Sequence, residues 1–310
     1  MSIDAALVTT AAVRLTTVAV RLRPRTVALA WSESRPLVQA MFQLRFMVAA
    51  VLAVAASGLS VHPARLAAAA VAWLCATWHV YLLNGVSDRV ADQANASRRP
   101  VACGRLPSGH ATALLSILAG CSLVFGLLAG WRVMLLAAAM MCLGSLYSMG
   151  RRAAKFSVPG SMAVIAAGGL ATYLAGWYAA GGGVPSGSVL MVAMVMSLWM
   201  SLAGMTKDLP DVCGDRLAGR RTLPVVLGER RARSVMALMV TGLALTVMAI
   251  AIHFGVMVPF AVTILIGASA VVVALIGRHW SVESRIRAPY RRFMVTQYGA
   301  HLGVLVESLL

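Results

Sequence analysis

The stretch "NGVSDRVADQANASRRPVACGRLPSG", residues 84–109, places Asp88 and Asp92 directly after a long apolar block. Acids are rare elsewhere, since only ten of the 310 residues are Asp or Glu. A carboxylate is costly close to hydrocarbon unless it has a partner or faces a polar cavity. Asp88 and Asp92 therefore indicate that the apolar segment before them ends at a polar cavity or beside a partner of opposite charge.

The composition is that of a membrane protein. Hydrophobic residues make up 60% of the chain, and its mean hydropathy is +0.83, well above the values of soluble domains. The apolar residues come in blocks of roughly 20, the length that a helix needs to cross a bilayer. Because each segment must pair its own backbone amides inside hydrocarbon, these blocks predict a helical bundle.

The apolar blocks divide the chain into two parts. Residues 1–40 are expected to form a basic N-terminal arm, amphipathic or disordered, and residues 41–310 are expected to follow as one nine-helix transmembrane domain. The predicted fold class is an all-α membrane protein with nine transmembrane helices, at residues 43–60, 66–86, 111–130, 133–149, 160–180, 188–206, 235–253, 256–277 and 293–309.

The distribution of basic residues predicts the orientation. With a cytoplasmic N-terminus, the inner segments hold 24 of the 27 Lys and Arg residues, whereas the outer loops hold only Arg65 and Arg132. This asymmetry is the positive-inside pattern of a multi-pass protein of the cell membrane. No nucleic-acid-binding motif accompanies the net charge of +17, so we expect the basic surface to face anionic lipid and phosphorylated substrates rather than nucleic acid.

Two clusters of polar residues sit at equivalent positions, after the second and the sixth predicted span. On a helix, the i, i+4, i+8 and i, i+3, i+7 spacings keep each set on one face. A lone Asp at a helix end is usually a solvated cap, but two face-matched rows would repel each other without a cation between them. Oxygen ligands of this kind suit Mg²⁺ bound together with phosphate oxygens. The predicted metal ligands are Asn84, Asp88, Asp92, Asp208, Asp211 and Asp215, and the five aspartates are also the predicted catalytic residues.

The first motif, with "RRPVACGRL" just beyond it, and the second motif, "KDLPDVCGDRLAGRRTLPVVLG", resemble the UbiA superfamily of intramembrane prenyltransferases. The resemblance covers about residues 40–310. It implies nine helices around a central cavity, two Mg²⁺ ions and a prenyl diphosphate donor. The chain departs from the family at Asn84-Gly85, where the family often has Asn-Asp, and at Cys213, where it often has a polar or acidic residue.

Basic side chains are needed to stabilise the departing diphosphate. By resemblance, Tyr147 and Lys155 in "LYSMGRRAAK" are predicted to bind substrate, followed by Lys207 and Arg98. The wider set of basic residues near the motifs is Arg98, Arg99, Arg105, Arg151, Arg152, Lys155, Lys207, Arg216, Arg220 and Arg221.

Two further substrate-binding residues are predicted within the spans. Arg45 lies in the first apolar block, where its charge is costly unless it faces the cavity. Tyr81 lies three residues before Asn84 and is expected to line the pocket, where an aromatic face can stabilise a cation.

The predicted reaction is Mg²⁺-dependent transfer of a prenyl group to a small aromatic acceptor, with loss of a proton from the ring. A membrane terpene cyclase, in which a double bond of the same prenyl chain attacks the cation, would use the same metal site. An ion-coupled transporter is a more remote alternative, because transporters tend to carry acids near the middle of the membrane.

Overall fold

Nine long helices and six short helical segments make up the described part of the chain, residues 23–58, 61–277 and 282–309, in this computed structural model. The elements are α2 (Pro24–Glu33), α3 (Pro36–Ser57), α4 (Pro63–Ser87), α5 (Arg89–Ala94), α6 (Ser108–Ala129), α7 (Trp131–Ser148), η1 (Ala154–Phe156), α8 (Val158–Ala179), α9 (Gly187–Leu202), η2 (Ala203–Asp208), α10 (Val212–Leu217), α11 (Leu223–Leu227), α12 (Glu229–Phe254), α13 (Val258–Ile276) and α14 (Val282–Leu309).

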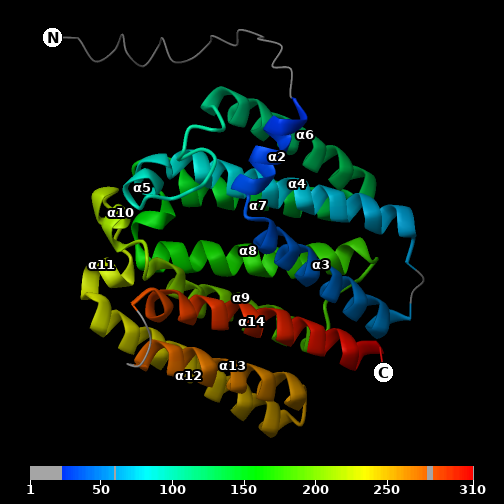
Figure 1. The fold of residues 1–310 in the computed structure, drawn as a ribbon. Coiled ribbons are helices and arrows are strands. Elements are labelled where there is room, and N and C mark those ends of the chain that lie inside the picture. The colour runs from blue at the N-terminus through cyan, green and yellow to red at the C-terminus, as the bar shows by residue number, and fades with distance from the viewer. Residues whose placement is uncertain (1–22, 59–60, 278–281, 310) are drawn as a thin grey trace, which may run out of the picture.

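The long helices lie side by side in a bundle, with α6 at one edge and α12 and α13 at the other (Figure 1). Helices α4, α6, α7 and α8 pack together in one half, and α12, α13 and α14 pack together in the other. Helix α3 joins the halves, because it packs against both α8 and α14. The short helices α5, α10 and α11 gather at the left-hand end of the bundle (Figure 1).

Eight helices are long and apolar enough to cross a membrane: α3, α4, α6, α7, α8, the α9–η2 segment, α12 and α13. Many large apolar side chains on them face outward, among them Leu128 at 68% exposure and Leu238 at 74%. Because a soluble protein rarely exposes large contiguous apolar surfaces, the predicted all-α multi-pass membrane fold is confirmed.

The predicted ninth span, residues 293–309, lies within α14, which packs against α13 and α3. This helix is not among the eight candidate spans of the described chain. Part of its low hydropathy comes from polar residues that face the bundle, since Thr296, Gln297 and His301 are all buried. The rest comes from charged residues, which are most frequent in its first half. The count of nine spans and the cytoplasmic N-terminus stay predictions.

The N-terminal segment differs from the expected arm. Helix α3 begins at Pro36 rather than near residue 43, with proline at its first position, where its missing N–H is harmless. The predicted boundary at residue 40 therefore falls inside α3. Before it, residues 24–33 form α2, which packs against α4 and α6. Residues 1–22 of the predicted arm lie outside the described residues.

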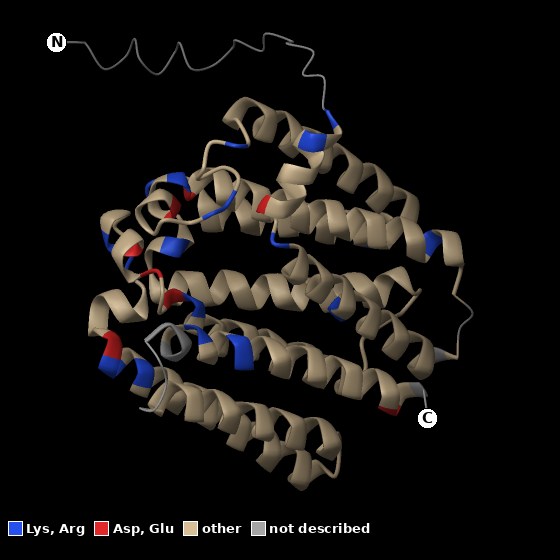
Figure 2. Cartoon of the chain, viewed as in Figure 1, with Lys and Arg blue, Asp and Glu red and all other residues tan. Residues whose placement is uncertain are grey.

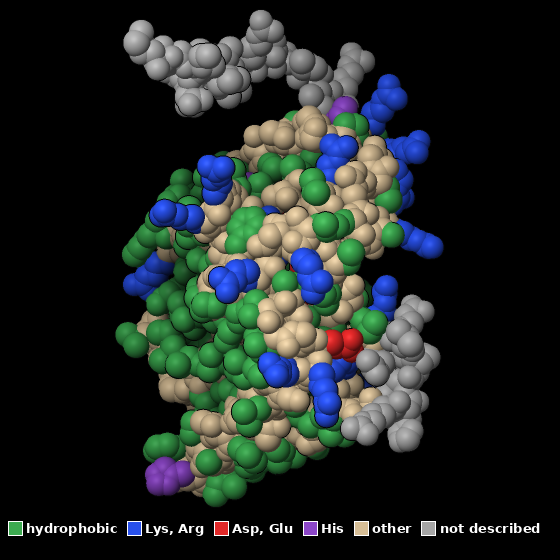
Figure 3. Space-filling view, turned by 90° about the vertical axis from the view of Figure 1, so that its left-hand side faces the viewer, with side chains coloured by type: hydrophobic (Ala, Val, Ile, Leu, Met, Phe, Trp, Pro, Cys, Tyr) green, Lys and Arg blue, Asp and Glu red, His purple; other side chains and the backbone are tan. Residues whose placement is uncertain are grey.

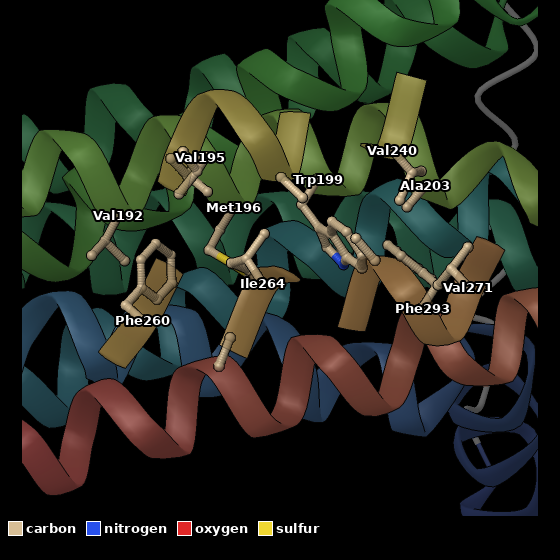
Figure 4. Close-up of a cluster of buried hydrophobic side chains, with 14 of the residues drawn as sticks. Val192, Val195, Met196, Trp199, Ala203, Val240, Phe260, Ile264, Val271 and Phe293 are labelled. Carbon is tan, nitrogen blue, oxygen red and sulfur yellow. The ribbon is translucent and has the colours of Figure 1, made fainter. Parts of the chain in front are cut away.

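Aromatic and branched side chains form the core between α9, α12, α13 and α14. Trp199 is fully buried and stacks on Phe293, with ring centroids 6.2 Å apart. Figure 4 shows Met196 and Ile264 beside this pair, and Phe260 farther along. The resulting contacts fix the C-terminal helices against α9, whose end carries the second acidic motif.

Helices α3 and α8 approach so closely that only glycine fits at position 176. A Cβ placed there would lie 2.0 Å from the backbone oxygen of Phe46. Small residues at such positions are the usual means by which membrane helices pack closely.

We expect Gly176→Ala to destabilise the protein by about 1–3 kcal/mol, because the two backbones must separate to admit the methyl group. Gly120→Ala is the matched control, since a Cβ at this helical position of α6 meets nothing within 4 Å. Thermal unfolding in detergent measures both variants. Equal melting temperatures for the two variants would show that the α3–α8 contact is not tightly packed.

Candidate active site

The two acidic motifs, far apart in the sequence, line one cavity. It has a volume of about 180 Å³ and is bordered by helices α3, α4, α7, α8 and α14. The predicted metal-binding residues that line it are Asn84, Asp88, Asp92, Asp208, Asp211 and Asp215. The structure therefore brings all six together.

The cavity mouth lies at the charged end of the molecule. Figure 2 shows that most acidic and basic segments gather at the left-hand end of the bundle, around α5 and α10. Figure 3, which views that end directly, shows Lys and Arg side chains spread over the surface, with an acidic side chain among them. The surface at this end of the bundle is therefore mostly basic.

Each motif is bent rather than carried on one continuous helix. Helix α4 ends at Ser87, and Asp88 forms its C-cap before α5 begins. In the second motif, Asp208 ends η2 and Asp211 precedes α10. Pro210 between them lacks a backbone donor and interrupts the helix. The prediction of one unbroken helical face was therefore wrong, although all the carboxylates still line the cavity.

Asn95 joins the two motifs. Its Oδ1 accepts a 2.7 Å hydrogen bond from the Gly214 backbone N–H, and its Nδ2 donates to the Asp211 backbone oxygen at 3.3 Å. A Cβ on Gly214 would lie 2.4 Å from this amide and from the Ala91 oxygen. Glycine at position 214 therefore permits α5 and α10 to touch.

Arg220 connects the acids of both motifs. One guanidinium nitrogen contacts Asp88 Oδ1 and the other lies 3.2 Å from Asp215 Oδ1. Lys155 Nζ lies 2.8 Å from the same Asp88 oxygen. Burial of the Asp88 carboxyl opposes its ionisation, but Arg220 and Lys155 outweigh this effect and hold its pKa below the usual value.

Two acids of the second motif, Asp211 and Asp215, ionise less readily than usual, because both have a raised pKa. Burial, together with repulsion from Asp208, raises the pKa of Asp215 to about 6. Burial also raises the pKa of Asp211, although Arg35 opposes it. A divalent cation beside these carboxylates would favour their ionised forms.

The donor set fits Mg²⁺ bound jointly with a substrate. The cavity offers carboxylate and amide oxygens from both motifs, which are the hard ligands that Mg²⁺ prefers. Among the described residues, no three Asp, Glu, His or Cys side chains are close enough to hold a metal by themselves. Mg²⁺ typically takes only one or two carboxylates and completes its coordination with water and phosphate oxygens.

Apolar and aromatic side chains line the deep part of the cavity. Tyr81 packs edge-on against Phe42, with ring centroids 5.9 Å apart. Arg45 lies over the Phe42 ring at 5.3 Å and contacts Gln297 Oε1 and Met200 Sδ. Its side chain is buried, and its Nε has no hydrogen-bond partner in the described structure.

The predicted substrate-binding residues fall into three groups. Arg45, Tyr81, Tyr147 and Lys207 line the main cavity. Lys155 lines a small adjoining pocket that shares Tyr147, Lys207 and Arg220 with it. Arg98 lines neither, because its side chain is exposed, whereas its neighbour Arg99 points inward and lies 2.8 Å from Asp92 Oδ2.

Four polar residues of the site were not expected from the sequence. Gln297, Arg35 and Asn95 line the cavity, and Glu33 lies behind it, 2.7 Å from Arg99 Nη2. Glu33 did carry a signal, because it is a rare acid in an apolar and basic chain. Asn95, Arg35 and Gln297 carried none, since their roles depend on contacts between distant elements.

The sequence profile of the UbiA prenyltransferase family matches residues 45–296, which is most of the chain. The chain belongs to the UbiA prenyltransferase family. The family and enzyme class predicted from the two acidic motifs are therefore confirmed.

Related proteins agree with this assignment. The digeranylgeranylglyceryl phosphate synthase of Natronomonas pharaonis is 32% identical over 186 residues, or 59% of this chain and 64% of the relative. The match thus spans less than two thirds of that enzyme. A solved UbiA homologue from Archaeoglobus fulgidus, bound to DMAPP and Mg²⁺, has a TM-score of 0.64 at 17% identity, covering 88% of this chain and 99% of its own. The same homologue bound to GPP and Mg²⁺ has a TM-score of 0.65, also at 17% identity with the same coverage. These structures share the fold.

We expect Arg220→Gln to destabilise the metal-free protein by about 3 kcal/mol, because two buried carboxylates lose their shared partner. Mg²⁺ should restore much of the loss and should raise the melting temperature more than it does in the wild type. Arg216→Gln is the control, since this exposed arginine on α10 has no ion pair among the described residues. Unfolding in EDTA and in Mg²⁺ provides the measurement. A variant as stable as the wild type in EDTA would mean that the Arg220 bridge does not hold the motifs together.

Proposed function

We propose that this protein transfers a prenyl group from a prenyl diphosphate to an acceptor inside the membrane, in a Mg²⁺-dependent reaction. The observation that carries the proposal is that two carboxylate motifs and a set of basic side chains share the mouth of a cavity with apolar walls. The polar mouth suits a diphosphate, and the walls suit an isoprenoid chain.

The two motifs would hold the metal. Asp88, Asp92 and Asn84 would provide ligands from one side, and Asp208, Asp211 and Asp215 from the other, for the two Mg²⁺ ions that the family resemblance implies. When bound, Mg²⁺ neutralises charge on the departing diphosphate.

The basic side chains at the mouth would bind the diphosphate directly. Arg220, Lys155 and Lys207 now pair with aspartates of the motifs. Once those carboxylates turn to a metal, the cations are free to donate hydrogen bonds to phosphate oxygens. Such contacts are strong in a site shielded from water, and they would promote cleavage of the C1–O bond.

The cavity wall must then protect an allylic cation from water. Tyr81, Phe42, Tyr147, Tyr290 and Phe293 present aromatic surface to the cavity. The faces of such rings attract a cation, and their bulk leaves little room for nucleophilic water. The nucleophile of the acceptor attacks C1 of the cation, and the acceptor loses a proton afterwards.

The acceptor that we propose is a small aromatic compound bearing an acidic group. Arg45 supports this choice, because it is buried about 14 Å along α3 from its start, lines the cavity and has no ion pair among the described residues. A charge at that depth requires a counter-ion or a polar cavity. A carboxylate on the acceptor would provide one, and Phe42 would pack against the ring.

A second candidate acceptor is a glyceryl phosphate bearing a prenyl chain. The relative from N. pharaonis is named as a digeranylgeranylglyceryl phosphate synthase, and a phosphate could pair with Arg45 as well as a carboxylate could. Cyclisation without any acceptor is the third outcome. A transporter is disfavoured, because within the eight candidate spans the acids occur only at terminal positions, Asp208 and Glu229.

We also propose that the cavity opens on the cytoplasmic side of the cell membrane. The end of the bundle that carries the motifs also carries most of the basic residues (Figure 2), as the positive-inside rule requires of a cytoplasmic face.

Purified protein with Mg²⁺, a C10–C20 prenyl diphosphate and an acidic aromatic acceptor should release diphosphate, and Asp88→Ala and Asp208→Ala should each abolish the release. The expected loss is at least about a thousandfold, since each change removes a ligand of the metal that would stabilise the departing diphosphate. Arg216→Gln should keep full activity. Turnover retained in both aspartate variants would refute the metal role. A cyclic hydrocarbon or alcohol formed without acceptor, read by mass spectrometry, would identify a cyclase instead.

The role of Arg45 predicts a selective effect on the acceptor. Arg45→Gln should raise the KM for an acidic aromatic acceptor about tenfold or more, since a buried charge partner is lost, while the KM for the prenyl diphosphate changes little. Parallel assays with a prenylated glyceryl phosphate determine whether the site prefers a carboxylate-bearing or a phosphate-bearing acceptor. An equal rise in both KM values, or activity only with uncharged acceptors, would contradict this assignment.

A further inference from the structure

The space beside Gly85 is filled by a residue from another helix. A Cβ at position 85 would lie 2.1 Å from Glu33 Oε1 and 2.8 Å from Arg99 Nη2. This is the position at which the chain departs from the Asn-Asp pattern of the family it resembles. A carboxylate is therefore present beside Asn84, but it comes from α2 instead of from the motif.

We propose that Glu33 is a positioning residue of the metal site. Its carboxylate keeps Arg99 paired, so that Asp92 can leave Arg99 and bind a cation. The inference rests on the proposed function, because it assigns Asp92 to the metal. It extends the site to the N-terminal helix, which lies outside the matched family region of residues 45–296.

Glu33, Arg99 and Asp92 form a chain of charges that leads into the cavity. Arg99 Nη1 lies 2.8 Å from Asp92 Oδ2, and Arg99 Nη2 lies 2.7 Å from Glu33 Oε1. The exposed fractions of the three side chains are 0% for Glu33, 12% for Arg99 and 17% for Asp92. One largely buried guanidinium thus lies between two carboxylates, only one of which lines the cavity.

Glu33 is held firmly in this place. Its Oε2 accepts a 2.9 Å hydrogen bond from the Val101 backbone N–H, and its backbone oxygen accepts one from Arg99 Nη2 at 3.2 Å. The preceding turn of α2 is fixed to α4, because Trp78 Nε1 donates to the Ala30 oxygen at 3.1 Å. The carboxylate is therefore built into the junction of α2 and α4, next to the first motif.

Hydrogen bonds just after Glu33 in the sequence fix the corner between α2 and α3. Gln39 Nε2 donates to the Ser34 oxygen at 2.9 Å, and Gln39 Oε1 accepts from Thr77 Oγ1 at 2.7 Å. Both Gln39 and Thr77 are fully buried. These bonds give Glu33 the fixed geometry that a positioning residue requires.

The charges explain why a second carboxylate is needed. If Asp92 turned toward a metal while it was the only partner of Arg99, a largely buried guanidinium would be left uncompensated. Removal of one member of a buried ion pair is strongly destabilising. Glu33 keeps Arg99 paired in both states, so Asp92 can bind a cation without that penalty.

Three substitutions test this role: Glu33→Gln, Gly85→Asp, and the double exchange Glu33→Ala with Gly85→Asp. Glu33→Gln keeps the shape and the acceptor for Val101 but removes the charge. We expect it to raise the Mg²⁺ concentration for half-maximal diphosphate release about tenfold, with a smaller effect on the KM for the prenyl diphosphate. A residue that serves only packing would leave the Mg²⁺ requirement unchanged.

The double exchange tests whether the carboxylate can be supplied from position 85. Gly85→Asp alone should impair Mg²⁺ activation at least as strongly as Glu33→Gln, because its side chain collides with Glu33. In the double variant that space is free and the new carboxylate can reach Arg99, so Mg²⁺ activation should return to within about threefold of the wild type. Glu229→Gln is the control, since its ion pair with Arg233 lies on α12, away from the cavity lining.

Two outcomes would overturn the role of Glu33: an unchanged Mg²⁺ requirement in Glu33→Gln, or a double variant no better than Gly85→Asp alone. The rise in melting temperature that Mg²⁺ produces without substrate provides an independent readout. If the wild type shows that rise but does not cleave prenyl diphosphates, the proposed function fails, and the rise in each variant still decides the role of Glu33. A wild type that shows neither response overturns both.

Discussion

The shared contact of Arg220 with Asp88 and Asp215 is the interaction on which the site depends. The two acidic motifs lie at the ends of different helices, and their carboxylates repel one another at the edge of an apolar bundle. Arg220, with help from Lys155, keeps them at one cavity when no metal is bound. In the proposed reaction, the same cations would bind the diphosphate while the carboxylates held a metal. A single arrangement of charges thus accounts for both the stability of the site and its proposed chemistry.

The bundle places this polar site beside an apolar cavity. Close packing at Gly176 brings α3 against α8, and the aromatic core around Trp199 fixes the C-terminal helices against α9. Helix α3 carries Arg45 to the cavity wall, about 14 Å along the helix from its start at Pro36. The diphosphate of a prenyl donor would meet the basic side chains at the mouth of the cavity. An acidic group on the acceptor would meet Arg45.

Several features were predictable from the sequence because they depend on composition and local spacing. Long apolar blocks predict membrane helices, and two polar rows after equivalent blocks predict a common site, as Asp88 and Asp208 illustrate. The breaks within the motifs were not predicted. The break at Pro210 carried a local signal that the assumption of a continuous helix overlooked, whereas the break at Asp88 carried none.

Other features depend on tertiary contacts and could not be derived from spacing. Arg98 and Arg99 look equivalent in the sequence, but only Arg99 forms ion pairs with Glu33 and Asp92, because α2 packs against α4. The low hydropathy of α14 likewise reflects in part Gln297 and His301, which face the interior of the bundle. Polar residues that are satisfied by distant helices reduce the hydropathy on which span prediction relies.

The central claim is that the two carboxylate motifs bind divalent cations and, through them, a prenyl diphosphate. Pulsed electron paramagnetic resonance of the protein with Mn²⁺ in place of Mg²⁺, and with a non-hydrolysable prenyl diphosphate analogue, tests it most directly. The account predicts ³¹P hyperfine coupling to bound Mn²⁺ that disappears in both Asp88→Asn and Asp208→Asn. Bound Mn²⁺ without ³¹P coupling, or coupling that survives both substitutions, would contradict it.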